Sequence, residues 1–408
     1  MELIRFLNNR EGGVAPMLAL AALPLFASVG ASIDFGRAAS ARAGMQGAVD
    51  TAALMMAKDA KVADPTQLAT TASNYVNANF QNAEVGNLET TVTTSSTSGG
   101  YSVTMTATGV VTTRFMGVMG FSTLNVSVNS TAVSNKDGLG CVLSLDSHAS
   151  GATTGQGSTN VVLNGCSLYD NSDSATALAV GGSAQFTALS VGVVGNLTGA
   201  ANITTTQGIK TGVGVVSDPY KDASFPAFSG CTEQNFSAKN PVTINPGVYC
   251  GGMKLNAGAD VTLTPGIYYL DGGDLTMNGG ATMTGDGVTL VFTSKNRNGY
   301  ATASINGNAT LNLKAPKSGG TAGIVIFGDR GMPVNTAFTF NGGATQNFGG
   351  AVYLPKGAVS FSGGASTSTN CTQLIGNTVT FTGNSGFALN CNNYGTKPFS
   401  PLNVKLTS

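Results

Sequence analysis

The sequence predicts a mostly β protein with an α-helical N-terminus: a transmembrane helix, then a small α+β head, then a parallel β-helix, or solenoid. Three observations predict it. They are a long uncharged segment near the N-terminus, a helical pattern directly after it, and a phrase of Asn, Gly and Ala that recurs in the C-terminal half. The expected domains are residues 1–11 (cytoplasmic N-terminus), 12–33 (transmembrane helix), 34–135 (α+β region) and 139–408 (solenoid).

The uncharged segment runs from Gly12 to Ile33 and contains 22 residues. As an α-helix it measures about 33 Å, enough to cross the hydrocarbon core of a bilayer. Two interpretations stay open: a retained membrane anchor, or a signal peptide cleaved near the small residues 27–31. The anchor is favoured because the apolar run is longer than a usual signal-peptide core and because helical sequence continues beyond it.

The helical pattern continues from Asp34 to Ala60, and a second helix is expected from Pro65 to about Asn79, with Asp64 as its N-cap. An apolar stripe lies on one face of the first segment and comprises Met45, Ala48, Val49, Ala52, Met55 and Met56. This stripe either packs on the protein's own sheet, which is favoured, or binds partner helices in a filament or membrane complex.

Residues 88–134 change to a period of two, which predicts antiparallel strands. Val103, Met105 and Ala107 alternate with Thr, and a helical turn is expected within residues 113–120. A long helix packed on a small antiparallel sheet is the plan of a pilin-like head.

The recurring phrase marks the last domain. Its copies are Asn256-Ala-Gly-Ala259, Asn278-Gly-Gly-Ala281, Asn306-Gly-Asn-Ala309, Asn341-Gly-Gly-Ala344 and the weaker Ser362-Gly-Gly-Ala365, which start 22, 28, 35 and 21 residues apart. Each copy lies beside a short alternating strand, so coils of about 20 residues with insertions predict a stacked parallel solenoid. The alternative is a β-sandwich whose strands are joined by Asn-Gly hairpins.

The six cysteines indicate an oxidising compartment. They are Cys141, Cys166, Cys231, Cys250, Cys371 and Cys391, and none lies in a Cys-x-x-Cys pair. Six cysteines allow 15 pairings. Sequential pairing gives separations of 25, 19 and 20 residues, each near one coil, and therefore predicts Cys141–Cys166, Cys231–Cys250 and Cys371–Cys391 as bridges between adjacent coils.

Composition argues against several classes of function. Charged residues make up 10% of the chain with no net charge, which gives no electrostatic case for nucleic-acid binding. His148 is the only histidine, so a zinc cluster lacks ligands, and it is expected to be a loop residue. We expect no cofactor, no metal and no catalytic residue.

Parallel β-helices often act on polysaccharides, so pairs of acidic residues are candidates for a catalytic site. Asp271 and Asp274 lie in a Gly-rich turn where Asp usually caps backbone amides. Asp286 is a further candidate, and Asp329-Arg330 is expected to be an ion pair in a turn. Carbohydrate binding without turnover would use exposed tyrosines, for which the candidates are Tyr268, Tyr269 and Tyr300.

The N-terminal residues resemble a known family. Arg5-Phe-Leu-Asn-Asn-Arg-Glu-Gly-Gly-Val-Ala15, then Val29-Gly-Ala-Ser-Ile-Asp-Phe-Gly-Arg-Ala-Ala39 and Met45-Gln-Gly-Ala-Val-Asp-Thr-Ala-Ala-Leu54, are similar to the start of TadG-like Flp pilus-assembly proteins. The resemblance covers the first 55 to 60 residues. Processed pilins carry Glu at the fifth mature position, where cleavage after Gly12 or Gly13 would leave Met17 or Leu18, so prepilin processing is not expected.

The resemblance implies a component of the bacterial tight-adherence machinery, anchored in the inner membrane by a single span with the bulk of the chain periplasmic or surface-exposed. Its expected partners are other tight-adherence or pilus proteins, contacted through the N-terminal helix. The expected role is structural or adhesive and non-catalytic. The alternative is an extracytoplasmic β-helix protein that binds or cleaves polysaccharide, with a surface glycan as partner.

Overall fold

The structure is a computed structural model, and it describes residues 14–59, 65–97, 100–136, 138–340, 345–361, 371–388 and 394–407. The chain forms two compact units. The first contains Met1–Asn135 together with Leu402–Ser408, and the second contains Lys136–Pro401. The predicted boundary at the C-terminal end is therefore wrong, since residues 402–408 leave the expected 139–408 domain and join the first unit.

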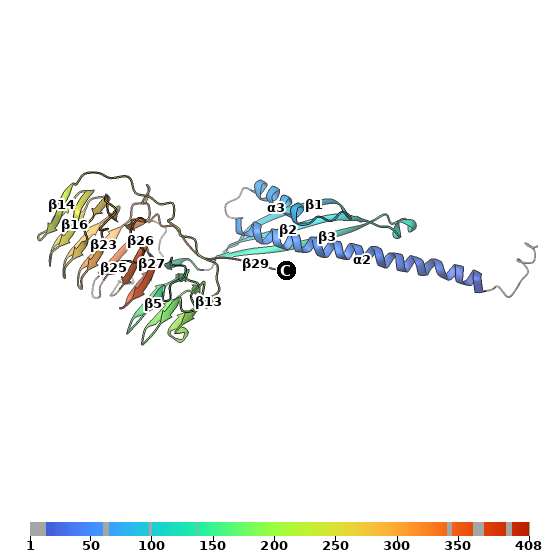
Figure 1. Ribbon diagram of the computed structural model, residues 1–408, viewed down its shortest axis with the longest axis horizontal. Coiled ribbons are helices and arrows are strands. Elements are labelled where there is room, and N and C mark those ends of the chain that lie inside the picture. The colour runs from blue at the N-terminus through green and yellow to red at the C-terminus, as the bar shows by residue number, and fades with distance from the viewer. Residues whose placement is uncertain are drawn as a thin grey trace, which may run out of the picture. The chain divides into compact units, whose positions relative to one another are not determined.

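The first unit is built on one long helix, α2 (Val14–Asp59), which continues through Pro24 without interruption. A second helix, α3 (Pro65–Asn79), follows. The strands β1 (Val85–Thr97), β2 (Gly100–Thr112) and β3 (Thr123–Lys136) pair antiparallel, and the last strand of the chain, β29 (Leu402–Leu406), adds to β3 (Figure 1). The predicted helices and antiparallel strands are thus present.

The apolar stripe of α2 packs against this sheet. Met45, Val49, Ala52 and Met56 are buried in one cluster with Val103 and other inward-facing sheet residues. Met55 is the exception, with 43% of its side chain exposed. The stripe therefore forms the core of its own unit, as the favoured interpretation predicts.

Strands of the second unit are short, and every pairing between its described residues is parallel. In chain order they are β4 (Gly140–Ser144), β5 (Thr153–Gly155), β6 (Asn160–Asn164), β7 (Ser167–Asp170), β8 (Leu178–Val180), β9 (Gln185–Ala188), β10 (Val191–Val193), β11 (Leu197–Thr198), β12 (Ile203–Thr205), β13 (Ile209–Thr211), β14 (Glu233–Ala238), β15 (Val242–Ile244), β16 (Gly247–Leu255), β17 (Asp260–Leu263), β18 (Gly266–Asp271), β19 (Leu275–Met277), β20 (Thr282–Gly285), β21 (Val288–Thr293), β22 (Ala303–Ile305), β23 (Thr310–Lys314), β24 (Ile324–Gly328), β25 (Thr336–Phe340), β26 (Thr345–Phe361), β27 (Thr372–Phe381) and β28 (Ser385–Ala388). The hairpins of the β-sandwich alternative would pair antiparallel, so that alternative is wrong.

The register of these strands repeats the spacing of the Asn phrase. Val261 pairs with Met283, Met283 with Leu311, and Leu311 with Gln346, which are steps of 22, 28 and 35 residues. At the corner before these strands, Asn306 Nδ2 donates to Asn278 Oδ1 at 3.3 Å. The phrase therefore marks equivalent positions on successive layers, while Asn341 and Ser362 lie outside the described residues.

The chain enters this stack in the middle. Starting from one end, the parallel order is β14, β16, β18, β21, β24, β26 and β27, and then β27 pairs with β4, so that Leu374 lies opposite Val142. From β4 the order continues through β7 and β10 to β13 at the other end (Figure 1). Residues 212–232, which contain no strand, carry the chain from one end of the stack to the other.

Candidate functional site

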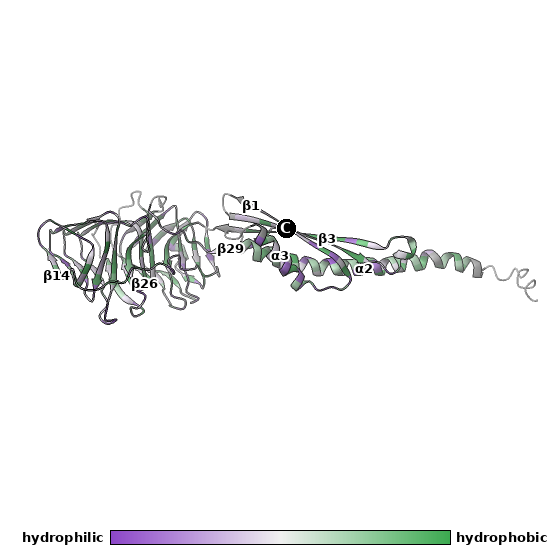
Figure 2. Cartoon of the chain, turned by 90° about the horizontal axis from the view of Figure 1, so that it is seen from above, coloured by the Kyte–Doolittle hydropathy of each residue, from purple (hydrophilic) through white to green (hydrophobic). Residues whose placement is uncertain are grey.

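The N-terminal half of α2 is an exposed apolar helix. Leu18, Leu25, Phe26 and Val29 each expose more than half of their side chains, and none of them joins the core of the first unit. By length and composition α2 can cross a membrane, with the candidate span placed between Met17 and Ala57 (Figure 2 shows its hydropathy). The predicted segment 1–11 lies outside the described residues.

A charged cluster lies where this apolar stretch ends. Asp34 is 1% exposed, and its carboxylate accepts three backbone hydrogen bonds from the loop after β2: from Arg114 N at 2.9 Å to Oδ1, and from Phe115 N and Met116 N, both at 2.8 Å, to Oδ2. These amides precede or begin a single 3₁₀ turn, η2 (Met116–Met119), whose first N–H groups have no partner within the turn. Asp34 therefore holds the β2–β3 loop against the helix.

Arg37 completes the cluster one turn further along. Its Nη2 lies 2.9 Å from Glu84 Oε1, and its Nη1 donates to Asp34 Oδ1 and to the Thr112 carbonyl, both at 3.4 Å. Four residues before Asp34, Gly30 packs against Phe115 so closely that an added Cβ would lie 2.5 Å from the Phe115 Cβ.

Sequence reasoning missed this junction as a site. Gly30, Asp34 and Arg37 are spaced i, i+4, i+7 and therefore share one helix face, which is a readable signal. Their partners, Glu84 and residues 114–116, carry no pattern that would have identified them.

The candidate carboxylates of the second unit accept hydrogen bonds from backbone amides or contact polar side chains. Asp271 Oδ1 accepts from Lys295 N at 2.7 Å, and Asp274 Oδ1 accepts from Thr302 N at 2.7 Å. Asp329 accepts from Gly331 N at 2.8 Å and from Thr293 Oγ1 at 2.6 Å. Asp286 forms an exposed ion pair with Lys314 at 3.3 Å.

These carboxylates are distributed over two ladders of the second unit. Asp271 ends β18 and Asp329 follows β24, two layers away in the same ladder, whereas Asp286 follows β20 in a different ladder. His148 lies elsewhere, exposed, with Nδ1 3.0 Å from Asp173 Oδ1, and the carboxylate of Asp173 raises the pKa of its imidazole. Among the described residues there is no group of three or more His, Cys, Asp or Glu side chains that could hold a metal ion.

A groove of about 660 Å³ opens in the second unit. Its walls include the aromatic residues Phe225, Phe228 and Tyr300, the basic residues Lys295 and Arg297, and Asp329. Of the tyrosines proposed for carbohydrate binding, Tyr300 is in this groove. The expectation of exposure is wrong for Tyr268, which is 0% exposed inside the stack, and for Tyr269, which is 8% exposed because Phe225 and Phe228 pack on it.

Residues 214–229, within the segment 212–232 that crosses the stack, are here called the strap, and Phe225, Ala227 and Phe228 of the strap form one wall of this groove. Arg330 holds the strap: Nη1 donates to Ala223 O at 2.7 Å, Nη2 donates to Tyr220 O at 2.5 Å, and the guanidinium also donates to Tyr353 Oη. Tyr353 in turn donates to Asp218 Oδ2 at 2.7 Å, and burial together with this carboxylate raises the pKa of Tyr353. The expected pairing of Arg330 with Asp329 is thus replaced by contacts to the strap.

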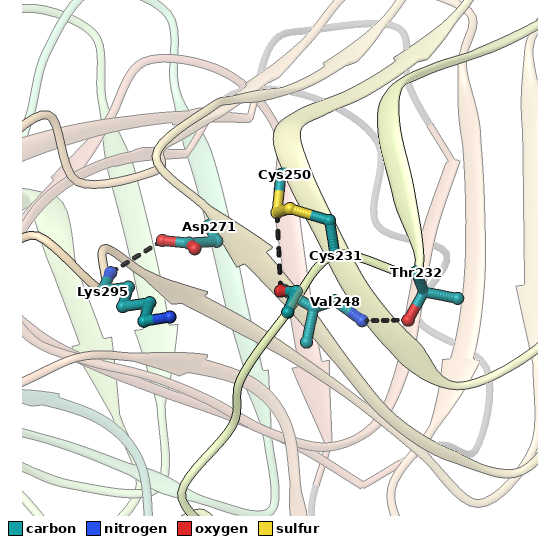
Figure 3. Close-up of a disulfide and its surroundings, with 7 residues drawn as sticks. Cys231, Thr232, Val248, Cys250, Asp271 and Lys295 are labelled. Carbon is teal, nitrogen blue, oxygen red and sulfur yellow. Dashed lines mark hydrogen bonds between the residues drawn. A yellow bond between two sulfur atoms is a disulfide. The ribbon is translucent and has the colours of Figure 1, made fainter.

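Two disulfides join neighbouring layers. Cys141 in β4 is bonded to Cys166, just before β7, and Cys231, before β14, is bonded to Cys250 in β16 (Figure 3), each with a Cα–Cα distance of 5.7 Å. Both are pairs that the sequential spacing predicts. Cys371 is also disulfide-bonded, and its predicted partner Cys391 lies outside the described residues.

Comparison with known proteins identifies the N-terminal segment. No curated protein and no solved structure matches the chain. The model of the putative Flp pilus-assembly TadE/G-like family matches residues 12–58, which are almost the whole of α2 and include Asp34 and Arg37. The chain therefore carries, over this helix, the Tad domain of the putative Flp pilus-assembly TadE/G-like family.

Proposed function

We propose that this protein is a membrane-anchored, extracytoplasmic component of the Flp/Tad pilus machinery with a structural or adhesive, non-catalytic role. The observation that carries the proposal is the division of the Tad segment by Asp34. Before Asp34 the helix is apolar and exposed, and after it the same helix is packed into the core of the first unit. A helix with these two halves is suited to hold a folded head at a membrane surface.

The proposed architecture is a pilin-like head followed by a parallel β-solenoid. The long helix packed on antiparallel strands supports the head. The solenoid is supported by the parallel ladders whose steps equal the spacing of the Asn phrase. Disulfides persist in oxidising compartments, which supports a periplasmic or surface location for both units and an inner-membrane position for the anchor.

Cell fractionation with N-terminal sequencing of the mature protein tests the anchor. We expect the full-length chain in the inner-membrane fraction, with its disulfides intact and its bulk digested by protease added to spheroplasts. A shortened protein in the soluble fraction would show that the helix is a cleaved signal and would overturn the proposal.

Attachment of cells that lack the protein, with and without the full-length gene supplied in trans, tests the adhesive role.

The groove favours glycan binding as a second candidate function. Aromatic rings stack on sugar faces, while Arg297 and Lys295 supply donors for acidic or hydroxyl groups. Tyr300→Ala and Arg297→Ala are expected to abolish signals on a glycan array, whereas the matched surface change Lys314→Ala, in the exposed pair with Asp286, leaves them unchanged. Silence of the unaltered protein on the array rejects this candidate, and polysaccharide cleavage lost on Asp329→Asn would favour an enzyme.

A further inference from the structure

The loop between β2 and β3 exposes an unusual amount of apolar surface. Phe115, Val118, Met119 and Phe121 expose 49%, 90%, 48% and 60% of their side chains. No charged residue occurs from Phe115 to Ser127. Contiguous exposed apolar surface of this kind marks a contact with a partner or a membrane. Residues 115–121 are here called the apolar tip.

Much of the backbone of the apolar tip is hydrogen-bonded within the first unit. Asp34 accepts from two of its amides, Phe115 N and Met116 N. Val118 N donates to Phe115 O at 3.2 Å, Gly120 N to Gly117 O at 3.1 Å and Phe121 N to Met116 O at 3.1 Å. The Thr113 hydroxyl donates to Phe121 O at 2.5 Å. A backbone that enters an apolar environment must pair its polar groups internally, and these bonds pair the N–H groups of Phe115, Met116, Val118, Gly120 and Phe121.

The position of the apolar tip along α2 is defined by two contacts. Asp34 is the first charged residue after the uncharged segment, so the hydrocarbon boundary of a spanned bilayer falls close to it. Phe115 packs on Gly30, four residues or about 6 Å nearer the bilayer along the helix. Interfacial apolar groups are typically buried about 5–10 Å into the headgroup and acyl boundary. Arg114, exposed at the start of the loop, is placed to reach the headgroups.

We propose that the apolar tip inserts into the membrane interface beside α2 and is a second, monotopic contact of the first unit with the lipid bilayer. The inference rests on the proposed membrane anchor. A single helix leaves the head free to tilt and rotate about its exit point. A second contact on a loop held to that helix by Asp34 fixes the orientation of the first unit at the membrane.

The absence of Trp from the chain allows a direct test with single-Trp reporters in the full-length protein, reconstituted in vesicles of phosphatidylcholine and phosphatidylglycerol. Val118→Trp reports on the apolar tip. Phe26→Trp, at a side chain 77% exposed within the apolar stretch, reports on the anchor. Thr94→Trp is the matched exposed control, because Thr94 pairs with Val103, about 30 Å along β2 from Thr112.

The measurement is quenching of Trp emission by lipids brominated at a shallow or a deep acyl position. We expect Val118→Trp to be blue-shifted and quenched most by the shallow label, Phe26→Trp to be quenched by both labels, and Thr94→Trp to match the emission of Trp in water. Phe121→Trp, at a second exposed side chain, repeats the test of the tip independently.

The outcomes separate the two proposals. If Phe26→Trp is not quenched, the membrane anchor fails. If Phe26→Trp is quenched while Val118→Trp and Phe121→Trp resemble Thr94→Trp, the anchor stands and the tip inference is wrong. A blue shift at the tip without quenching by either lipid also overturns the inference, because it would mean that another protein covers the tip.

Discussion

Asp34 links helix α2 to residues 114–116, a segment 80 positions away in the sequence. Its carboxylate accepts hydrogen bonds from three backbone amides, which would otherwise need water as their acceptor. Asp34 lies within α2, although Asp is a weak helix former. The arrangement explains why an acidic residue directly follows 22 uncharged ones: its charge is matched by the loop amides and by Arg37.

Replacing Asp34 tests this role. In Asp34→Ala, the amides of residues 114–116 lose their acceptor, and their hydrogen exchange is expected to rise at least about tenfold, the factor that corresponds to one ordinary hydrogen bond. Exchange measured by mass spectrometry over the β2–β3 loop gives the result. Asp50→Ala, on the same helix, is the control and leaves that exchange unchanged. Equal protection in both variants would mean that the loop is held without Asp34.

Asp170 gives the second unit a defined pH dependence. It is 1% exposed at the end of β7, and burial raises its pKa to about 6, although Ser172 N donates to Oδ1 at 2.9 Å. The folded state therefore holds a proton that the unfolded state, with a pKa near 3.8, releases. Stability contributed by this proton is complete below about pH 4 and is lost as the pH rises to about 6.

The free energy of unfolding of the second unit is expected to fall by about 3 kcal/mol over this pH range. The figure follows from the shift of the Asp170 pKa from 3.8 to about 6, since one pKa unit corresponds to about 1.4 kcal/mol. Denaturant unfolding of the second unit from pH 4 to pH 7 measures it. Asp170→Asn, which keeps the shape of the side chain without its charge, is expected to be more stable than the unaltered protein at pH 7 and to lack this decrease. An unchanged slope in Asp170→Asn would assign the pH dependence to other groups.

At the scale of elements, α2 serves two environments with one continuous helix. Its first half exposes large apolar side chains, while its second half buries small ones, such as Ala41 and Ala52, so that the sheet approaches closely. Gly30 lies between the halves and is the position at which the loop touches the helix.

Two glycine substitutions distinguish the effect of the contact between Gly30 and Phe115 from the general effect of Ala on helix stability. Gly30→Ala places a methyl group 2.5 Å from the Phe115 Cβ and is expected to displace the β2–β3 loop, raising amide exchange at residues 114–116. Gly36→Ala meets nothing within 4 Å and is expected to stabilise the helix by up to about 1 kcal/mol. Thermal unfolding in detergent and amide exchange check both. A Gly30→Ala protein that behaves like Gly36→Ala would contradict the proposed contact.

The strap is held by polar contacts to several separate layers of the stack. Asn171 Nδ2 donates to Val216 O at 2.9 Å, and Val216 N donates to Asn171 Oδ1 at 2.8 Å. The Tyr220 hydroxyl donates to Gln373 Oε1 at 2.8 Å, and the Tyr269 hydroxyl donates to Pro226 O at 3.0 Å. Arg330 lies between these contacts and satisfies two strap carbonyls, while stacking over the rings of Phe327 and Tyr353.

Arg330→Met keeps the length and apolar stem of the side chain but removes all of its hydrogen bonds. Limited proteolysis is expected to cut within residues 212–232 faster in this variant, because the carbonyls of Tyr220 and Ala223 lose their donor. Lys314→Met removes an exposed ion pair in the same unit and is expected to have no measurable effect. Equal cleavage rates would show that the apolar contacts of the strap suffice.

At the scale of the molecule, the chain order and the spatial order differ. The second unit is inserted between β3 and β29 of the first, and within it the last layers dock on the earliest one, at β27 and β4. Both units therefore contain contacts between residues more than 200 positions apart. The C-terminal residues must be present before either the fourth strand of the first sheet or the centre of the stack is complete.

A substitution at Val404 tests whether the C-terminal strand β29 packs in the first unit. It is partly buried against the core of the first unit, so Val404→Ser is expected to lower the stability of that unit by at least about 1 kcal/mol and to leave the second unit unaffected. Lys405→Ser changes the exposed neighbour on the same strand and serves as the control. Separate unfolding of the two units, followed by amide exchange, distinguishes them. Destabilisation of the second unit alone would contradict the assignment of β29.

The sequence by itself determined the features that local chemistry specifies: the apolar helix, the Met and Ala stripe, the alternation of the strands and the step between layers, which the Asn phrase marks because each layer needs the same corner. Only the tertiary structure decided the capping of the β2–β3 loop by Asp34, the binding of the strap by Arg330, the junction of β27 with β4 and the pairing of β29 with β3. These contacts join residues that are 80 or more positions apart, and the free energy that selects them comes from packing and hydrogen bonds made only after the local elements have formed.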